Sequence, residues 1–436
     1  MRVSHLIRAL LIPDSVKNIT PSDVMILRHD TDCGYLFEDK KYSQLADTLA
    51  MELREKGLST LTVATPYSAC DPGGCYNDPV SMNRITFLGN ICSRALRYLW
   101  FGKKTTEISK GFRQWAWRRV IAKSKPKLVV GIQPPLELFE VCMSQGIPCY
   151  DLQHGIVLPE ELYYAALLET LRLADQQVGV LCWDEATVRK IRKATEENPH
   201  VDTPLVGNLW VRRFRQPRVS DKLIQEAIDG APLITGKPVI LITLQWRLQE
   251  LYRLRNVQET LSGWVMPEPL ENIIRSTCDE FDWWIKMHPV AARSQEGKQQ
   301  LDYLNRNFGG LAGVHFGSEV LNTPLPALMK FAHAHLTDSS ACTLEATQFG
   351  LVTGLWNPIF EDPQVLKNWF PALEGTGEIS FVKWQENEIL RWLKAAIANV
   401  RPIGTAFEPT SQNLANWADA FTRRTLISGA AIEVLR

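Results

Sequence analysis

Short apolar, β-rich runs alternate with longer stretches of helical spacing along most of the chain, and this alternation constrains the fold more than any other feature. In the first half the runs lie at 24–28, 60–65, 127–132 and 147–151, with helical stretches at 41–56, 81–100, 110–124 and 135–145. In the second half the runs lie at 178–183, 238–244, 283–288, 331–336, 351–356 and 379–384. The helical stretches there lie at 220–229, 268–279, 296–307, 341–349, 385–399 and 411–426. Strands that alternate with helices form parallel sheets whose two faces are covered by helices.

The chain has 436 residues, which suits two domains of about 200 residues better than one. Both halves carry the same alternation, so the predicted fold is α/β, with two Rossmann-like domains that face each other across a cleft. We place the boundary after LLETLRLADQQ, which gives an N-terminal domain of 1–177 and a C-terminal domain of 178–436. The segment TPLVGNLW (203–210) is expected to begin the second sheet, and the helix at 411–426 to return to the first domain.

Composition narrows the class of protein. The chain holds 48 Lys plus Arg and 48 Asp plus Glu, a balance that argues against a dedicated nucleic-acid-binding protein. Its hydrophobic share of 45% and charged share of 22% are typical of a chain with folded cores. The 9 cysteines show no disulfide framework, which indicates a reducing cytoplasm. CDPGGC (70–75) reads best as a Gly-rich turn, with a metal site or a strained disulfide as the alternatives.

The start of the chain, MRVSHLIRALLIPD, is expected to form a helix rather than a signal peptide, because Arg8 interrupts its apolar run. No apolar stretch approaches the roughly 18 residues of a membrane span. The sequence therefore predicts a protein that is cytoplasmic, either soluble or bound peripherally at the inner face of the membrane.

Polar residues follow four of the predicted strands: LRHDTD (27–32), YDLQHG (150–155), IKMHP (285–289) and LTDSS (336–340). In open α/β sheets, ligands bind outside the carboxyl ends of the strands. These four segments are therefore the candidates for functional residues.

Two of these segments lie in the second half and suit a phosphate. Lys286 and His288 alternate along a strand end and are expected to share one face, and Pro289 ends the strand. Ser339 or Ser340 is expected to cap a helix that begins near Ala341, where free N–H groups favour an anion.

Glu345, about one turn into that helix, could reach the hydroxyls of a sugar. The alternatives are structural. The serine is then an ordinary helix cap, Glu345 serves the helix dipole, and His288 satisfies a backbone carbonyl.

The other two segments lie in the first half. Asp151 and His154 at a strand end suit an acid/base or nucleophile pair, with a hydrogen-bonded loop as the alternative. His29, Asp30 and Asp32 follow the first strand and could bind a metal or the hydroxyls of an acceptor sugar, with an ordinary polar loop as the alternative. No cluster with metal-ligand spacing stands out, so we expect no metal and no resident cofactor.

Taken together, LQHG, VGN, Lys-x-His-Pro and TDSS…E, in that order, resemble the motifs of bacterial surface-polysaccharide glycosyltransferases of the two-domain GT-B fold. The relatives include capsule and O-antigen Kdo transferases, sialyltransferases and polysialyltransferases, and more distantly the teichoic-acid glycerophosphotransferases. The resemblance covers roughly residues 40–360.

The resemblance implies roles for several residues. His288, Ser339 and Ser340 would hold the phosphate of a nucleotide-sugar donor, with Glu345 near the ribose. Many relatives use cytidine-linked donors, so the favoured donor is CMP-linked Kdo or a sialic acid. The acceptor would be a lipopolysaccharide, capsule or lipid-linked glycan. The alternatives are a glycerol- or ribitol-phosphate transferase that uses a cytidine diphosphate donor, and a non-catalytic Rossmann-like assembly subunit.

The stretch 94–127, RALRYLWFGKKTTEISKGFRQWAWRRVIAKSKPK, holds eleven Lys or Arg residues and one acid, Glu107. Six aromatic residues lie among them: Tyr98, Trp100, Phe101, Phe112, Trp115 and Trp117. This pattern fits an anionic membrane surface, because basic residues attract lipid headgroups and aromatic rings settle at the interface. It fits equally two core helices whose aromatic rings face inward. Nucleic acid is the third reading.

Overall fold

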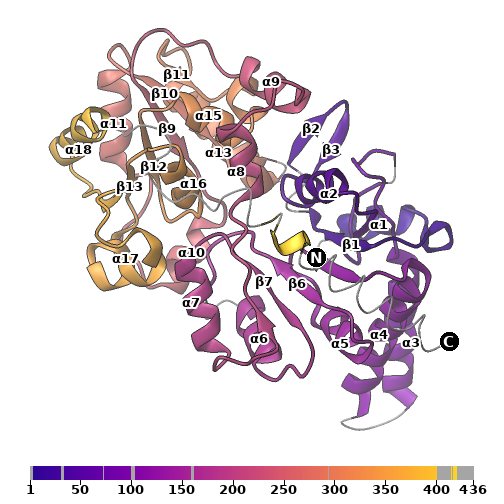
Figure 1. The fold of residues 1–436 in the computed structure, drawn as a ribbon. Coiled ribbons are helices and arrows are strands. Elements are labelled where there is room, and N and C mark those ends of the chain that lie inside the picture. The colour runs from indigo at the N-terminus through magenta and orange to yellow at the C-terminus, as the bar shows by residue number, and fades with distance from the viewer. Residues whose placement is uncertain are drawn as a thin grey trace. The chain divides into compact units, whose positions relative to one another are not determined.

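The computed structural model describes residues 3–30, 34–71, 73–99, 104–158, 162–292, 294–399, 414 and 416–419, and of 3–4, 93–99 and 104–108 it describes only the backbone. The chain forms two compact units, Met1–Leu209 with Pro409–Arg436, and Trp210–Glu408. Each unit holds one six-stranded sheet in which every strand pairs in parallel with its neighbours (Figure 1).

The sheet of the first unit has the order β4-β1-β5-β6-β7-β8. Its strands are β1 Val24–Arg28, β4 Thr60–Ala64, β5 Leu128–Gly131, β6 Cys149–Leu152, β7 Val178–Leu181 and β8 Val201–Asp202, and a separate hairpin is formed by β2 Tyr35–Phe37 and β3 Lys40–Tyr42. The helices are α1 Val3–Leu11, η1 Val16–Asn18 (a 3-10 helix), α2 Ala46–Glu55, α3 Asn83–Leu99, α4 Lys104–Ser124, α5 Leu136–Ser144, α6 Leu162–Arg172 and α7 Glu185–Ala194.

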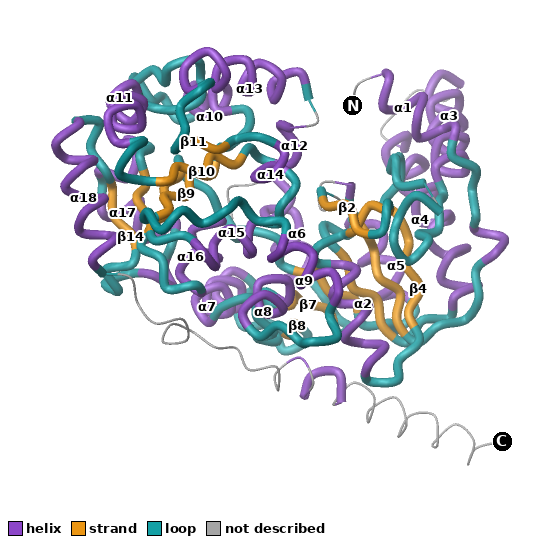
Figure 2. Tube along the Cα trace, turned by 90° about the horizontal axis from the view of Figure 1, so that it is seen from above, coloured by secondary structure: helices purple, strands orange, loops and turns teal. Residues whose placement is uncertain are grey.

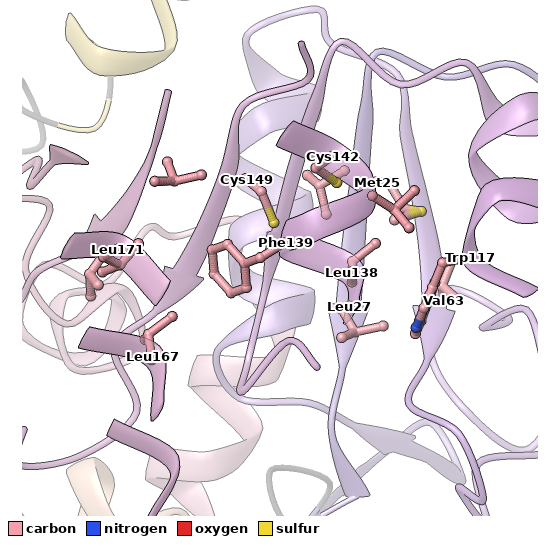
Figure 3. Close-up of a cluster of buried hydrophobic side chains, with 14 of the residues drawn as sticks. Met25, Leu27, Val63, Trp117, Leu138, Phe139, Cys142, Cys149, Leu167 and Leu171 are labelled. Atoms are coloured by element: carbon pink, nitrogen blue, oxygen red, sulfur yellow. The ribbon is translucent and has the colours of Figure 1, made fainter. Parts of the chain in front are cut away.

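Helices cover both faces of this sheet. Helices α4, α5, α6 and α7 contact one another in series on one face, and α2 packs against β1 and β4. The core beneath α4–α6 includes Trp117, Phe139 and Cys149 (Figure 3). Because side chains alternate along a strand, Tyr150 points away from this core. Its ring packs against Trp417, with ring centroids 5.5 Å apart, so the chain does return to the first unit near its C-terminus, as predicted.

The sheet of the second unit has the order β11-β10-β9-β12-β13-β14. Its strands are β9 Val239–Thr243, β10 Asp282–Lys286, β11 Val314–His315, β12 Ala334–Thr337, β13 Thr353–Leu355 and β14 Ile379–Phe381. The helices are α8 Leu209–Arg215, α9 Lys222–Asp229, α10 Leu248–Leu254, α11 Glu268–Thr277, α12 Pro289–Ala292, α13 Gln295–Phe308, α14 Ser318–Leu321, α15 Leu325–Phe331, α16 Cys342–Gln348, α17 Pro363–Trp369 and α18 Glu386–Ala398, with 3-10 helices η3 Pro358–Glu361 and η4 Pro371–Leu373.

The central strands of both sheets are fully buried and mostly apolar, as β1 (VMILR) and β9 (VILIT) show. In the second unit, α11 contacts α18 and shares one core with α13. Helix α15 packs on β9, and α16 on β12 and β13 (Figure 2). The order β11-β10-β9-β12-β13-β14 is that of a Rossmann fold, with the chain reversing direction between β9 and β12. In the first unit the corresponding reversal lies between β1 and β5.

The predicted boundary at 177/178 is wrong. Strand β7 pairs with β6, and β8 pairs with β7, so both belong to the first sheet. The segment 203–210 does not begin the second sheet either. The N–H groups of Val206 and Gly207 donate to the carbonyl oxygen of Cys182, which ties this segment to the end of β7. The division between the units therefore falls at Leu209/Trp210.

Candidate functional site

The carboxyl edge of the second sheet gathers four chain segments around the point where the strand order reverses. Strand β9 lies between β10 and β12, and the segments that follow these three strands and β13 meet at this edge. Ligands of open α/β sheets bind at such a reversal. The residues here form two groups: a buried hydrogen-bonded network and a less buried rim.

Asp338, which follows β12, is the centre of the buried network. Its Oδ2 accepts a hydrogen bond from the hydroxyl of Tyr252 at 2.6 Å. Its Oδ1 accepts from Nδ2 of Asn357 at 2.8 Å and from Oγ of Ser339 at 2.9 Å. Burial raises the pKa of Asp338, and these three donors oppose that rise. The carboxyl group thereby fixes the ends of β12 and β13 relative to α10.

Gln245 connects this buried network to the segment after β9. Its Oε1 accepts a hydrogen bond from the backbone N–H of Ser339 at 3.0 Å, and it shares the single proton of the Ser339 hydroxyl, 3.1 Å away, with Oδ1 of Asp338. Ser339 is therefore buried and committed to the fold. The next residue, Trp246, stacks on the imidazole of His288 after β10, with ring centroids 5.9 Å apart and planes 25° apart. Gln245 and Trp246 thus connect the two motifs that the sequence separates.

The ring of His288 has a defined tautomer. Its Nδ1 accepts a hydrogen bond from the backbone N–H of Val290 at 3.1 Å. In a neutral imidazole only the other nitrogen can then carry the proton, so Nε2–H is a donor. His288 is partly exposed, and the guanidinium of Arg247 lies 5.4 Å from the ring centroid of Trp246 on the same rim. Pro289 is exposed and opens the short helix α12.

Lys286 does not share the rim with His288. Its Nζ donates to the carbonyl oxygens of Val320, Leu321 and Thr323 at 2.8, 3.0 and 2.8 Å, at the end of α14. Burial lowers the pKa of Lys286 to about 7, yet only the ammonium form has the three donors that these carbonyls accept. The geometry therefore gives Lys286 a role in holding α14 rather than the donor contact expected from the sequence.

Ser340 and Glu345 lie on or beside α16. Ser340 is partly exposed, and its Oγ accepts from the backbone N–H of Cys342 at 3.2 Å. Glu345 is partly exposed on the same helix. The N-cap position of α16 is thus Ala341, not one of the two serines as predicted; Ser340 precedes it and binds the first N–H of the helix, while Ser339 belongs to the buried network. Of the predicted donor-binding residues, His288, Pro289, Ser340 and Glu345 reach the surface in this unit.

In the first unit, His29 follows β1 at the reversal of the strand order. It lines a cavity of about 290 Å³ together with residues that follow β4 and β5. Gly131 at the end of β5 permits a close approach to β1, because a Cβ there would lie 2.6 Å from Cβ of Leu27. Burial lowers the pKa of His29.

Asp30 faces a neighbouring loop. It accepts from the hydroxyl of Ser68 and, at 2.8 Å, from the backbone N–H of Ala69, and burial raises its pKa. Asp32 lies outside the described residues. In the same loop Cys70 and Cys75 are buried thiols rather than a disulfide, and Sγ of Cys70 donates to Oδ1 of Asp30 at 3.2 Å.

Asp151 is 0% exposed. Its Oδ1 accepts from the backbone N–H of Gln133 at 3.0 Å and from the hydroxyl of Tyr163 at 3.2 Å. Its Oδ2 is buried and has no hydrogen-bond partner in the described part of the chain. Burial raises the pKa of Asp151 to about 8, against the effect of its two donors. The carboxyl is therefore largely protonated at neutral pH, and it anchors the segment after β5.

His154 lies close enough to His29 for their charges to interact. Burial lowers the pKa of His154 to about 4, the bond to Leu152 opposes this, and His29 lowers it further. Its ring stacks on Tyr164 with centroids 5.7 Å apart. Nδ1 lies 3.4 Å from the carbonyl oxygen of Leu152. Because a carbonyl only accepts, Nδ1 carries the proton, and Nε2 is left with a lone pair. His154 and His288 therefore have opposite tautomers.

In the basic stretch 94–127, some aromatic side chains are buried, as core helices would have them, and others are exposed, as a membrane surface would have them. Trp117 is 1% exposed and lies in the core, whereas Trp115 is 48% exposed with the guanidinium of Arg119 5.7 Å from its ring centroid. Phe112 of the same helix, α4, is half-buried and lies against Gly89 of α3. The side chains of Tyr98, Trp100 and Phe101 lie outside the described residues.

Within the described part of the chain, no group of three or more His, Cys, Asp or Glu side chains is placed to hold a metal ion. Among the helices that the structure describes, none is both long and apolar enough to cross a membrane.

Comparison with known proteins identifies the fold. No protein-family model matches the chain, and no curated protein matches it in sequence. Solved structures do match. UDP-GlcNAc 2-epimerase from Neisseria meningitidis, bound to UDP-GlcNAc, is 14% identical over 93% of this chain and 99% of its own, with a TM-score of 0.53. The wall teichoic acid polymerase TagF, soaked with CDPG, is 11% identical over 97% of this chain and 94% of its own, also at 0.53.

The fold is GT-B-like. UDP-GlcNAc 2-epimerase from Methanocaldococcus jannaschii, in complex with UDP-GlcNAc and UDP, matches equally well, at 13% identity and a TM-score of 0.53 over 93% of this chain and 99% of its own. The prediction of two Rossmann-like domains is thereby confirmed. At these identities the similarity establishes the architecture, and function has to be argued from the residues.

Four residues of the second unit were not recognised in the sequence: Gln245, Trp246, Tyr252 and Asn357. Gln245 and Trp246 directly follow the apolar run of β9, so the rule that selected the other four segments also points to them. Tyr252 and Asn357 carry no comparable signal, because their roles depend on contacts with Asp338 that are distant in sequence.

Proposed function

We propose that the protein is a glycosyltransferase whose nucleotide-sugar donor binds at the carboxyl edge of the second sheet. The observation that carries this proposal is the connection made by Gln245 and Trp246. Gln245 holds Ser339 beside Ser340, and Trp246 stacks on His288. Three strand ends are thereby fixed around the reversal of the strand order, where α/β folds bind nucleotides.

The donor's phosphate would be neutralised by hydrogen-bond donors. The Nε2–H of His288 and the hydroxyl of Ser340 would stabilise the leaving phosphate, and Glu345 would accept from a ribose hydroxyl. Pro289 would set the direction in which the chain leaves β10. In this proposal the phosphate needs no metal ion.

The first unit would bind the acceptor and take up its proton. His154 is neutral at physiological pH and has a lone pair on Nε2, as a general base requires. Asp151 would position the segment after β5 through its hydrogen bond with Gln133. It is buried, whereas a nucleophile must reach the substrate. His29 would contact the acceptor, and Asp30 would support it through the loop at 68–70. Asp32 completes the predicted acceptor group.

For the donor we favour CMP-linked Kdo or a related sialic acid, on the resemblance of the Lys-x-His-Pro and TDSS motifs. The acceptor would be a bacterial surface polysaccharide or a lipid-linked glycan. Transfer of glycerol or ribitol phosphate from a cytidine diphosphate donor is the second candidate, and the shared fold with TagF supports it. The third is a non-catalytic assembly subunit.

The first unit would also dock on an anionic membrane through 94–127. Trp115 and Arg119 are exposed on α4, and Leu88 and Ile91 are exposed on the neighbouring α3. An exposed apolar group beside basic side chains suits an interface of anionic lipids.

The test is incubation with a panel of donors, CMP-Kdo, CMP-sialic acid, CDP-glycerol and UDP-GlcNAc, with surface-glycan acceptors. Mass spectrometry then measures the released nucleotide and the mass added to the acceptor. We expect release of CMP and addition of one sugar, and strongly reduced turnover in His288→Ala. His200→Ala, which removes an exposed histidine outside the site, is the matched control.

Addition of a polyol phosphate would replace the first candidate by the second. Isomerisation of UDP-GlcNAc without an acceptor would contradict both. No turnover and no nucleotide binding would favour the assembly subunit.

A further inference from the structure

The cavity of about 290 Å³ in the first unit has a composition that the reading of the sequence did not predict. It lies at the carboxyl edge of the sheet, where the ends of β1, β4 and β5 meet α3 and α4. Its lining combines an apolar wall with polar side chains of both hydrogen-bonding types.

The apolar wall comes mainly from α4. Trp117 and Ala116 line the cavity and are themselves packed in the core, so this wall is rigid. Tyr67 lines it from the end of β4, and its hydroxyl accepts from Nδ2 of Asn90 on α3. An aromatic surface at the edge of a polar cavity suits the apolar C–H face of a sugar ring.

The backbone at the cavity is held in an uncommon conformation. Tyr67 and Gln133 have φ angles of 64° and 48°, the left-handed region that non-glycine residues seldom adopt. Such conformations persist where the surroundings hold them. Gln133 is held by Asp151, through the hydrogen bond from its N–H. The cavity is thus a fixed feature of the fold.

The polar side of the cavity holds an ion pair whose hydrogen-bonding groups are only partly used. Nε of Arg113 lies 2.7 Å from Oε1 of Glu137. In the part of the chain that the structure describes, this is the one polar contact of either side chain, so the terminal N–H groups of Arg113 and Oε2 of Glu137 can bind a ligand. A sugar diol satisfies both, because each hydroxyl donates and accepts. Since the two charges cancel, an anion gains little here.

The size limits the ligand to one ring. A volume of about 290 Å³ lies at the lower end of ligand pockets, which span roughly 300–1,000 Å³. We propose that this cavity binds one neutral monosaccharide unit, the terminal residue of the acceptor glycan. The identification as acceptor rests on the proposed transferase function, whereas sugar binding by the cavity does not.

The test measures binding to the full chain without a donor. Saturation-transfer NMR is recorded with methyl glycosides of glucose, galactose, mannose, N-acetylglucosamine and rhamnose, and with methyl glucuronoside as the anionic comparison. We expect at least one neutral glycoside to bind, and to bind better than methyl glucuronoside. Arg113→Ala should weaken that binding roughly five- to tenfold through the lost N–H donors.

Ala116→Leu should abolish binding, because the larger side chain fills the cavity, and thermal unfolding will show that the variant is folded. Asn305→Ala, an exposed asparagine on α13 in the other unit, is the control and should bind normally.

Three results would overturn the proposal: no binding by any neutral glycoside, stronger binding of methyl glucuronoside, or unchanged binding in both cavity variants. If the donor panel shows no transferase activity while a neutral glycoside binds and Ala116→Leu abolishes it, the proposed function fails and the sugar site stands. Active transfer with an unchanged KM for the acceptor in Ala116→Leu would refute the site alone.

Discussion

Replacing Asp151 by asparagine should stabilise the protein, by an amount that depends on pH. The carboxyl is 0% exposed, and burial raises its pKa to about 8. In an unfolded chain an aspartate has a pKa of about 3.9. The folded-state pKa is thus the higher one. The contribution of Asp151 to stability is therefore complete below about pH 4, and it is lost progressively as the pH rises to about 8.

The magnitude follows from the pH range over which the carboxyl is ionised only in the unfolded chain. About three pH units lie between pH 4 and pH 7, and each corresponds to about 1.36 kcal/mol, so at pH 7 the wild-type side chain costs roughly 4 kcal/mol of folding free energy relative to its value at pH 4. Asparagine keeps the oxygen that accepts from Gln133 and Tyr163 and cannot ionise. Asp151→Asn should therefore be more stable than wild type by about 2–4 kcal/mol at pH 7, with the difference shrinking toward pH 4.

The assay is urea unfolding of both proteins from pH 4.5 to 8, compared at each pH so that all other titrating groups cancel. Asp175→Asn, which changes an exposed carboxyl, is the control and should shift stability by less than about 0.5 kcal/mol. A difference that does not change with pH, or an asparagine variant that loses stability as the pH rises, would refute the assignment of a neutral buried carboxyl.

Three further predictions concern other parts of the molecule. Lys286→Met should lower the free energy of unfolding by about 2–4 kcal/mol, because it leaves three carbonyls at the end of α14 without their donor; urea unfolding measures this, and an unchanged midpoint would contradict the role in holding α14. Activity should survive excess EDTA, since the proposed phosphate site consists of hydrogen-bond donors; loss of turnover that Mg²⁺ restores would contradict it. In flotation assays the protein should bind vesicles with anionic lipid at low salt, and a variant carrying Trp115→Ser and Arg119→Glu should bind less; equal behaviour on neutral and anionic vesicles would leave the buried-helix reading of 94–127.

The sequence predicts the strands well and their partners poorly. The runs at 24–28 and 238–244 match β1 and β9 closely, because central strands of parallel sheets are apolar on both faces. The run at 178–183 is equally clear as a strand, yet nothing in its residues shows which sheet it joins. Strand pairing is a contact between distant segments, and the boundary was misplaced for that reason.

The same limit applies to the site residues. The alternation of side chains placed Lys286 on the face of His288, but the sequence could not reveal that the end of α14 supplies three carbonyls to its ammonium group. Ser339 and Ser340 look equivalent in the sequence. Contacts with Gln245 and Asp338 commit the first to the fold and leave the second on the rim.

Isothermal titration calorimetry with cytidine monophosphate tests the central claim, that a nucleotide phosphate binds at the carboxyl edge of the second sheet. Wild type and the control His200→Ala should bind with equal affinity. His288→Ala should lose about 2–4 kcal/mol of binding free energy, the scale of losing a donor to a charged group. Equal affinity of His288→Ala and wild type, or no binding by any of the three proteins, would contradict the account.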